Sequence, residues 1–376
     1  MNHRYTLSPF YQLSPKRKTG VYLHHVLDSE TYIINPVVHS YLSFFVGKQI
    51  TFLKSVALFA KKNDSTSEEV LETVNRFFGD MFHQSILIRA EEYIHLQAFP
   101  SQKEAQEKEI LQGYHVKKTL SQAYYLSIYL VENIETQSLS VLKILHLNAF
   151  FSSDDKQTFK RALLQEIRIL EKLKAYSDVV QILQHTDNEV YMTLELENVK
   201  GKSLHKFVAD NPEMTKDNRA KLLQNVIAAY THLHDLDILH GDIHGSNILV
   251  QEDFSVTLID FDMAYHNTRK RGEIISKGGV QYYIAPEKIS KNAFKVAGKR
   301  ADFRSEVYQI GVIGYIIFMN NLPFEADSWK RLATKIKTEN PSFEQSTLSQ
   351  SIITFLQRAM HKDPNERFSS AATMIL

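Results

Sequence analysis

The spacing of apolar residues predicts a small mixed unit at the start of the chain. Residues 20–34, GVYLHHVLDSETYII, have the composition of two short strands around a polar turn. Asn35 and Pro36 then form a typical helix start, with a capping side chain followed by proline at the first helical position. A second helix is expected over ITFLKSVALFAKK, and a third begins in STSEEV with Ser65 or Ser67 as its cap. The short strand SILIR closes this unit.

The pattern changes along the remainder of the chain. The polar stretch QAFPSQKEAQEKEILQ predicts a linker whose second half has helical character. The strand-rich segments YHVKKTL, YYLSIYLV and SLSVLKIL follow, and the segments after them are mostly helical. This order predicts an α+β protein. The expected domains are a small unit at 1–96, a linker at 97–113 and a large domain at 114–376, whose β-rich lobe covers 114–197 and whose helical lobe covers 198–376.

Composition excludes several classes of protein. The 376 residues carry a net charge of +1, so no overall field indicates a nucleic acid or an anionic membrane as partner. The absence of cysteine excludes disulfides, thiolate metal sites and a cysteine nucleophile, and it fits a reducing cytoplasm. No apolar run approaches the roughly 20 residues that a membrane-spanning helix needs. The first twenty residues lack the apolar core of a signal peptide. We therefore expect a cytoplasmic protein.

Three polar islands lie in apolar sequence between residues 240 and 287, namely HGDIHGSN, IDFD and APE. They resemble motifs of protein kinases, which transfer a phosphoryl group from ATP, and the resemblance implies that Asp242 orients the acceptor hydroxyl and takes its proton. It also implies that Asn247 and Asp260 supply oxygen ligands for magnesium. His232, His234, His240 and His244 could instead form a zinc cluster, but the spacing from His240 onward fits the kinase pattern His-x-Asp-x-x-x-x-Asn better. His232 and His234 are then packing residues, and His240 is structural.

These motifs resemble those of protein kinases over residues 114–376. The resemblance extends to SEVYQIGVIGYIIF, with Glu306 where an aspartate is usual, and to DPNERFS, whose Arg367 is expected to pair with Glu287. It implies a bilobal fold that uses ATP and Mg²⁺. Lys143 in VLKIL would contact the phosphates, because an ammonium in an apolar strand needs a counter-charge and a phosphate.

The resemblance also assigns the partners of Lys143 and of adenine. Glu166, beside the apolar face of the helix FKRALLQEIRILEKL, would be the counter-charge of the lysine. Glu197 and Val199, at the end of VYMTLELENV, would offer backbone groups to adenine.

Several positions depart from the protein kinase pattern. Ser121, Ala123 and Leu126 stand where the phosphate-binding loop has three glycines, which normally let the backbone approach the phosphates closely. Gly241 replaces an arginine that pairs with phosphorylated activation loops, so activity is expected not to depend on such phosphorylation. The sequence GGVQYYIAPE, residues 278–287, resembles the substrate-docking segment of serine/threonine kinases, and in it Val280 replaces the usual threonine.

His244 stands where serine/threonine kinases carry a lysine that contacts the transferred phosphate. In this position, and in Asp260-Phe261-Asp262, the chain is similar to aminoglycoside and choline phosphotransferases. Three functions therefore stay open: a serine/threonine-type protein or peptide kinase, which we favour, a small-molecule phosphotransferase, and a pseudokinase scaffold. The run Arg269-Lys270-Arg271 is either a solvated loop or a contact for acidic substrates.

Residues 18–90 resemble the PqqD-like, winged-helix domains that recognise precursors of ribosomally made peptides. The resemblance implies that a leader peptide adds as a strand along the edge from Glu30 to Ile34 and packs against the helix from Ser67 to Met81. The kinase would then phosphorylate a leader-bound peptide precursor, as in lanthipeptide-like pathways. The alternatives are an adaptor without a peptide partner and a DNA-binding winged helix. Phosphate contact is disfavoured because the third helix is acidic, with Glu68, Glu69, Glu72 and Asp80 against Arg76.

Overall fold

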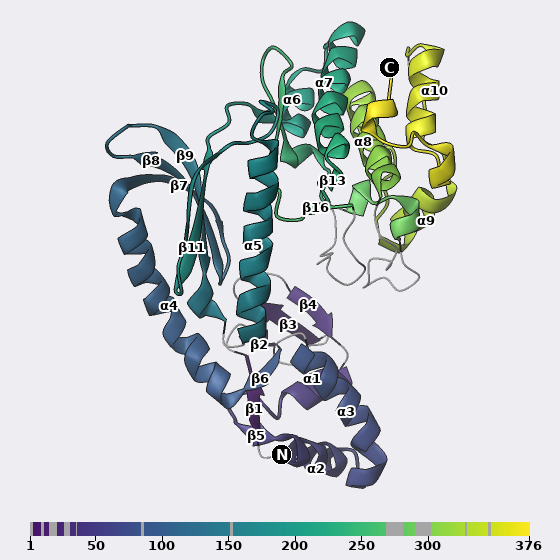
Figure 1. Ribbon diagram of the computed structural model, residues 1–376. Helices are drawn as coiled ribbons and strands as arrows, with labels where there is room; N and C mark the ends of the chain where they lie inside the picture. Colours follow the sequence, from purple (N-terminus) through teal and green to yellow (C-terminus); the bar gives the residue numbers. More distant parts are fainter. Residues whose placement is uncertain are drawn as a thin grey trace. The chain divides into compact units, whose positions relative to one another are not determined.

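The computed structural model describes residues 3–8, 11–14, 21–25, 31–34, 36–83, 86–150, 153–267, 281–289, 302–327, 329–344 and 347–376. The chain divides into two compact units. The first contains Met1–Thr158 and Thr186–Thr193, and the second contains Phe159–His185 and Leu194–Leu376. Most of their helices and strands are labelled in Figure 1, and each unit is described by itself.

The N-terminal part of the first unit is a small α/β region. One antiparallel sheet has the order β5-β1-β6 and a second the order β2-β3-β4. The strands are β1 (Arg4–Leu7), β2 (Tyr11–Leu13), β3 (Val21–His25), β4 (Thr31–Ile34), β5 (Ile50–Thr51) and β6 (Leu87–Arg89), and the helices are α1 (Pro36–Leu42), α2 (Phe52–Lys62) and α3 (Ser67–His83). The core includes Tyr41, Leu42, Phe45, Val74 and Leu87. The hairpin β3–β4, the three helices and strand β6 match the sequence prediction, whereas β1, β2 and β5 were not predicted.

The cap of α3 differs from both predicted residues. The Thr66 hydroxyl accepts from the Glu69 N–H at 3.3 Å, and the Glu69 carboxylate accepts from the Thr66 N–H at 2.8 Å. This reciprocal pair is a capping box, which satisfies two of the unpaired N–H groups at a helix start. The predictions of Ser65 and Ser67 as caps are therefore wrong by one residue. Asn35, the predicted cap of α1, and Glu30 of the predicted peptide edge lie outside the described residues.

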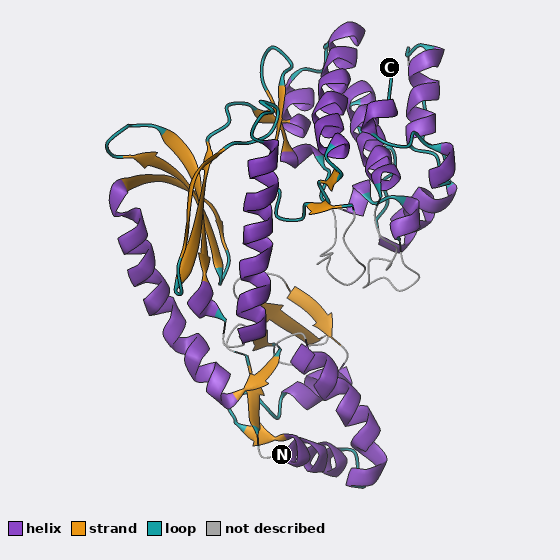
Figure 2. Cartoon of the chain, viewed as in Figure 1, coloured by secondary structure: helices purple, strands orange, loops and turns teal. Residues whose placement is uncertain are grey.

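Helix α4 (Ala90–Ile110) occupies most of the segment predicted as a linker at 97–113, and the 3-10 helix η1 (Leu111–Gly113) follows it. Figure 2 shows α4 as one helix. It continues through Pro100, although proline inside a helix removes one backbone hydrogen bond. The helical character expected for the second half of this segment is thus found along nearly all of it.

A five-stranded sheet forms the β-rich lobe, in the order β10-β11-β9-β8-β7. Its strands are β7 (Tyr114–Gln122), β8 (Leu126–Asn133), β9 (Leu139–His146), β10 (Ile182–Asp187) and β11 (Tyr191–Glu197). Both β7–β8 and β8–β9 pair antiparallel, and Tyr129, Val131, Leu142 and Ile144 form a buried cluster between them. The three strands predicted from the sequence after Tyr114 are all present.

The second unit is mainly helical. Helix α5 (Ser153–Leu173) begins in the first unit and continues in the second. The other helices of the second unit are α6 (Leu204–Asp210), α7 (Lys216–Asp235), α8 (Phe303–Met319), α9 (Trp329–Thr338) and α10 (Gln350–Ala359). Helix α8 is mainly apolar after its first turn, and 13 of its 17 residues are buried, as expected of a central helix.

Short strands carry the polar motifs of this unit. They are β12 (Lys202–Ser203), β13 (Ile238–Leu239), β14 (Ile248–Val250), β15 (Val256–Leu258) and β16 (Tyr265–His266). The predicted α+β class is confirmed, with a β-rich lobe followed by a helical lobe. Among the described helices, none has both the length and the apolar content needed to cross a membrane.

Candidate active site

The loop between β13 and β14 brings three predicted residues together. The Asn247 amide Nδ2 donates to the main-chain carbonyl of Asp242 at 3.0 Å and reaches its carboxylate at 3.3 Å. His244 Nε2 lies 3.3 Å from the same carboxylate oxygen. The Asp242 side chain keeps 22% of its surface exposed. The loop therefore presents an oriented carboxylate that an acceptor hydroxyl can reach.

Asp260 lies beside this loop because of the hairpin β14–β15. Ile248 pairs with Leu258, and the Ile259 N–H donates to the Asn247 carbonyl at 3.0 Å. The next residue, Asp260, has φ of +66°, a left-handed conformation that costs free energy in a residue other than glycine and that clusters at functional sites. The Asn247 amide nitrogen donates to Asp242, and the Asn247 side-chain oxygen and the Asp260 carboxylate are oxygen donors in the same unit. Magnesium prefers such hard donors, and the residues fit it.

His240 holds the loop in place from the interior of the protein. It is fully buried, and its Nε2 donates to the Ile259 carbonyl at 3.2 Å, while its ring packs on Phe261 at a centroid distance of 4.8 Å. Burial lowers the pKa of His240, although the negative charges of Glu306, Asp242 and Asp260 oppose the shift. A neutral imidazole with one donated hydrogen bond has the structural role that the sequence predicts.

Gly241 has a conformation that explains the missing arginine. Its φ is +81°, and its N–H donates to Glu306 Oε1 at 2.8 Å. A Cβ atom at this position would lie 2.4 Å from the Met263 carbonyl oxygen, far inside van der Waals contact. Because only glycine combines this φ with so close an approach, this backbone excludes an arginine here.

We predict that Gly241→Ala destabilises the protein by about 1–3 kcal/mol, because alanine is strained at positive φ and meets Met263. The phosphotransfer activity should also fall, because the next residue is Asp242. Calorimetric unfolding and a phosphotransfer assay measure the two effects. Gly113→Ala is the matched control, because a Cβ there meets nothing within 4 Å. Equal stability of the two variants would contradict this account of the loop.

A buried network links the loop to more distant parts of the second unit. The Ala371 N–H donates to His234 Nδ1 at 2.9 Å, so the proton of this imidazole is on Nε2, which donates to Glu306 at 2.9 Å. The Glu306 carboxylate thus accepts hydrogen bonds from both the His234 side chain and the Gly241 N–H. His232 stacks on Tyr176 at 4.2 Å and contacts Asp178. Both histidines pack as predicted, and the described residues contain no group of three or more acidic or histidine side chains that could hold a metal.

The docking segment contacts the catalytic loop through two residues that the sequence analysis did not identify. The Tyr283 hydroxyl lies 2.8 Å from His205 Nε2 on α6. Gly245 packs so closely on the His205 ring that a Cβ atom would lie 2.8 Å from it. Burial raises the pKa of Tyr283, and burial followed by the charge of His244 lowers the pKa of His205. No local pattern reveals this pair, because its members are 78 residues apart. Val280 and residues 269–271 lie outside the described residues.

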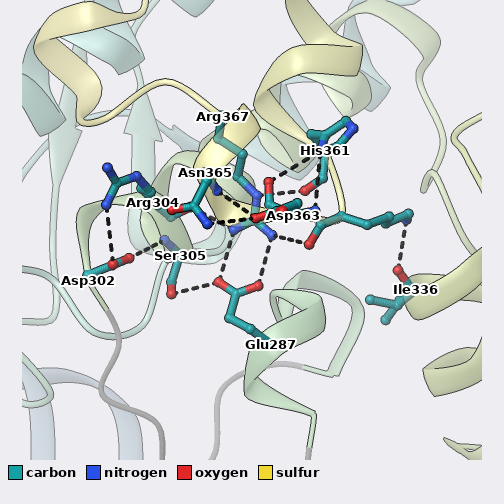
Figure 3. Close-up of polar contacts among 10 residues, drawn as sticks. Glu287, Asp302, Arg304, Ser305, Ile336, His361, Asp363, Asn365 and Arg367 are labelled. Carbon is teal, nitrogen blue, oxygen red and sulfur yellow. Dashed lines mark hydrogen bonds and ion pairs between the residues drawn. The ribbon is translucent and has the colours of Figure 1, made fainter.

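The predicted pair Arg367–Glu287 is confirmed (Figure 3). Two guanidinium nitrogens donate to the two oxygens of Glu287 at 2.9 and 2.8 Å, and Ser305 donates to the same carboxylate at 2.8 Å. The remaining arginine donors reach the carbonyls of Arg304, His361 and Lys362. Burial alone would raise the pKa of Glu287, but the bonds and charge of Arg367 hold it below its usual value.

The other predicted nucleotide-binding residues are divided between the units. In the first unit, Ser121 pairs with Ile128 near the end of β7, Ala123 lies in the β7–β8 turn, and Lys143 is buried in β9 opposite Ile128. Glu166 is buried in α5, in the second unit. The pairing of Lys143 with Glu166 therefore stays a prediction.

Strand β11 ends at Glu197, which begins the predicted adenine-binding segment. The Glu197 N–H donates to the Gln181 carbonyl at 3.0 Å, and the Gln181 N–H donates to the Glu197 carboxylate at 3.0 Å. The Glu197 N–H is thus used within the protein, and Val199 remains as the predicted contact for the base.

Comparison with known proteins decides the family. The protein kinase domain family matches residues 114–376. The chain belongs to the protein kinase family. CBL-interacting protein kinase 14 of Oryza sativa subsp. japonica is 25% identical over 274 residues, which cover 71% of this chain and 58% of that protein. Mitogen-activated protein kinase kinase kinase 5 of Arabidopsis thaliana is 27% identical over 261 residues, covering 69% of this chain and 35% of that protein.

Calcium/calmodulin-dependent protein kinase type 1 of Caenorhabditis briggsae is 25% identical over 274 residues, covering 70% of this chain and 72% of that protein. The chain spans less than two thirds of the length of two of these curated relatives, 58% of the rice kinase and 35% of the Arabidopsis kinase. The family and the protein kinase fold, with its β-sheet lobe and helical lobe, follow from these matches.

Proposed function

We propose that this protein is a serine/threonine-type protein kinase that uses ATP and Mg²⁺. The observation that carries the proposal is the convergence of Asp242, Asn247 and Asp260 in one compact unit, within the residues that match the family. Related proteins whose names describe serine/threonine-protein kinases support the acceptor class. The Asp242 side chain is partly exposed, so the hydroxyl of a protein substrate can contact it.

The residues of the loop then have distinct tasks. Asp242 accepts a hydrogen bond from the acceptor hydroxyl, orients it and takes its proton as the phosphoryl group moves. Asn247 and Asp260 would hold magnesium through oxygen atoms. Bound Mg²⁺ would neutralise the charge of the phosphates. His244, 3.3 Å from the Asp242 carboxylate, orients that carboxylate and lies where the family has a phosphate-contacting lysine.

Binding of the nucleotide is assigned to residues on several elements. Lys143 would hold phosphate oxygens, with Glu166 as its counter-charge, and the backbone of Ser121 and Ala123 would approach the phosphates. Val199, with the Glu197 carbonyl, would meet adenine. These assignments are supported by burial of Lys143 and Glu166 and by the position of the β7–β8 turn.

A protein acceptor is favoured over a small molecule by the docking segment. In protein kinases this segment docks the substrate, and here it is fixed twice, by Tyr283 to His205 and by Glu287 to Arg367. His244 and the Asp260-Phe261-Asp262 sequence favour the alternative of an aminoglycoside- or choline-type phosphotransferase. A pseudokinase scaffold is disfavoured because Lys143, Asp242, Asn247 and Asp260 are all present.

The full chain, radiolabelled ATP and magnesium should be incubated with a generic protein such as casein, with aminoglycosides and with choline. We expect label on the protein and none on the small molecules. Label on an aminoglycoside or on choline alone would replace the proposal with the small-molecule phosphotransferase. No label on any acceptor, with ATP still bound, would favour the scaffold.

We further propose that the N-terminal region binds a substrate peptide, with the leader of a ribosomal peptide precursor as the intended ligand. The observation that favours it is the place of β4 as an outer strand of its sheet, where a peptide can add as a further strand. Hydrogen exchange of residues 31–34 should slow when a candidate precursor is added. Unchanged exchange at a peptide concentration that supports phosphorylation would remove this proposal and leave the kinase assignment intact.

A further inference from the structure

Helix α4 packs against the turn between β7 and β8, with three residues spaced four apart on one face. Phe99, Lys103 and Glu107 form this stripe, which we call the α4 stripe. The Phe99 ring is fully buried, and its centroid lies 4.7 Å from that of Tyr124 and 5.9 Å from that of His146. A helix outside the family match therefore contacts the predicted phosphate-binding loop.

Lys103 contacts the backbone of that loop directly. Its ammonium donates to the Ala123 carbonyl at 2.8 Å and lies 3.5 Å from the Tyr124 carbonyl. Only 9% of the residue is exposed. Burial lowers the pKa of Lys103, and the charge of Glu107, whose carboxylate oxygen lies 4.0 Å away, opposes that shift. A buried ammonium is costly unless its donors are satisfied, so these carbonyls are specific partners.

Glu107 fixes the other side of the stripe. Its carboxylate accepts from the Ser127 hydroxyl at 2.6 Å and lies 3.2 Å from His146 Nε2. Ser127 belongs to β8 and His146 ends β9, so one carboxylate joins α4 to two strands of the sheet. The His146 N–H in turn donates to the Tyr125 carbonyl at 2.9 Å. The carbonyls of residues 123–125 are thus held by Lys103 and by β9.

The direction of these carbonyls fixes the direction of the neighbouring N–H groups. A trans peptide is planar, with its C=O and N–H pointing opposite ways, and the described residues contain no cis peptide. Since the Ala123 carbonyl faces Lys103, the N–H of Tyr124 faces away from α4. Phosphates are bound by N–H groups and repelled by carbonyl oxygens. A phosphate-binding loop must therefore direct its N–H groups toward the phosphates and its carbonyls away from them. Glycines usually allow this, and here the three positions are occupied by Ser121, Ala123 and Leu126.

We propose that α4 holds the phosphate-binding loop in one conformation, a role we call a brace, and that Lys103 is a positioning residue for ATP. Lys103 holds the carbonyls of Ala123 and Tyr124 away from the nucleotide, a task that glycines perform in the family pattern. The inference rests on the proposed ATP-dependent function. It adds a residue outside the matched domain to the machinery that binds ATP.

The test compares three full-length variants with the wild type. Lys103→Met keeps the length of the side chain and removes its charge and donors, whereas Lys103→Arg keeps both. Lys108→Met is the matched control on the same helix, because the Lys108 side chain is 75% exposed and pairs with Glu104. Three quantities are measured: hydrogen exchange at residues 121–127 without nucleotide, the affinity for ATP·Mg by calorimetry, and kcat and KM for ATP.

We expect Lys103→Met to speed exchange at residues 121–127 and to raise both the Kd and the KM for ATP about tenfold, with a smaller change in kcat. Lys103→Arg should recover most of the affinity, and Lys108→Met should match the wild type. Unchanged exchange in Lys103→Met would overturn the brace, and faster exchange with unchanged ATP affinity would overturn the positioning role. If the wild type binds no ATP, the proposed function fails and the positioning role with it, while exchange still decides whether α4 holds the loop.

Discussion

Asp242→Asn should reduce kcat for phosphorylation of a protein substrate by about 10²–10⁴-fold, because asparagine cannot accept the proton of the acceptor hydroxyl. The fold should be unaffected. An asparagine has nearly the same shape, and its side-chain oxygen can still accept from the Asn247 amide, which also bonds the main-chain carbonyl of residue 242. Initial rates at saturating ATP and protein substrate measure the effect.

The control for this variant is Asp235→Asn, at the exposed end of α7, which should keep wild-type rates. The affinity for ATP·Mg should stay within about threefold in both variants, because Asp242 is not assigned to the metal or the nucleotide. Wild-type kcat in Asp242→Asn would contradict the assignment of Asp242 as the base. If Asp242→Asn lost both activity and melting temperature, the loss of activity would instead be due to disruption of the loop.

Arg367→Met should destabilise the protein by about 3–5 kcal/mol, because it leaves the Glu287 carboxylate buried without its cation. In a domain of this size such a loss lowers Tm by roughly 10 °C. Glu287→Met should also destabilise, by less, since Arg367 keeps its bonds to three main-chain carbonyls. The double variant should lose less than the sum of the two, because neither charge is then left unpaired. Calorimetric unfolding of the four proteins gives the coupling free energy.

The exposed pair Arg331–Asp327 provides the matched control. Its atoms are 2.6 Å apart, but the side chains are 72% and 68% exposed, so Arg331→Met should change the unfolding free energy by about 1 kcal/mol or less. Additive losses in the cycle of Arg367 and Glu287 would contradict the importance of their contact.

Stability at acid pH offers a second readout of the same pair. The folded-state pKa of Glu287 is lowered, so the pair contributes fully above the usual carboxyl pKa of about 4.5. The contribution is lost as pH falls from there through the lowered value. Between about pH 5 and pH 3 the wild type should therefore lose Tm more steeply than the double variant. Parallel pH profiles would place the acid sensitivity elsewhere.

The order of the helical lobe could be predicted because its signals are local. The sequence around Asp242 and Asn247 is a short loop between apolar strands, and Asp260 follows such a strand directly. Even the contact of Glu287 with Arg367, 80 residues apart, followed from the resemblance to a known family. The conformation of Gly241 could not be predicted, since its close approach to Met263 depends on how two loops pack.

Only the second half of helix α4 was predicted to be helical, and its packing against the sheet was missed for a physical reason. Its buried stripe consists of Phe99, Lys103 and Glu107, and two of these three residues are charged, so the apolar period that indicates a helix is absent. Pro100 beside the stripe strengthens the expectation of a linker. The lysine and glutamate are buried because the β7–β8 turn and β9 supply partners for them, and such partners are distant in the sequence. Strands β1, β2 and β5 were missed because each is too short for a period.

The central claim is that this chain moves phosphate from ATP to serine or threonine side chains of a protein. The most direct measurement is phosphosite mapping by mass spectrometry, on a protein substrate incubated with ATP, magnesium and either the wild type or Asp242→Asn. The account predicts phosphoserine and phosphothreonine with the wild type and almost none with the variant. Phosphate on no residue, on tyrosine alone, or equally with both proteins would contradict it.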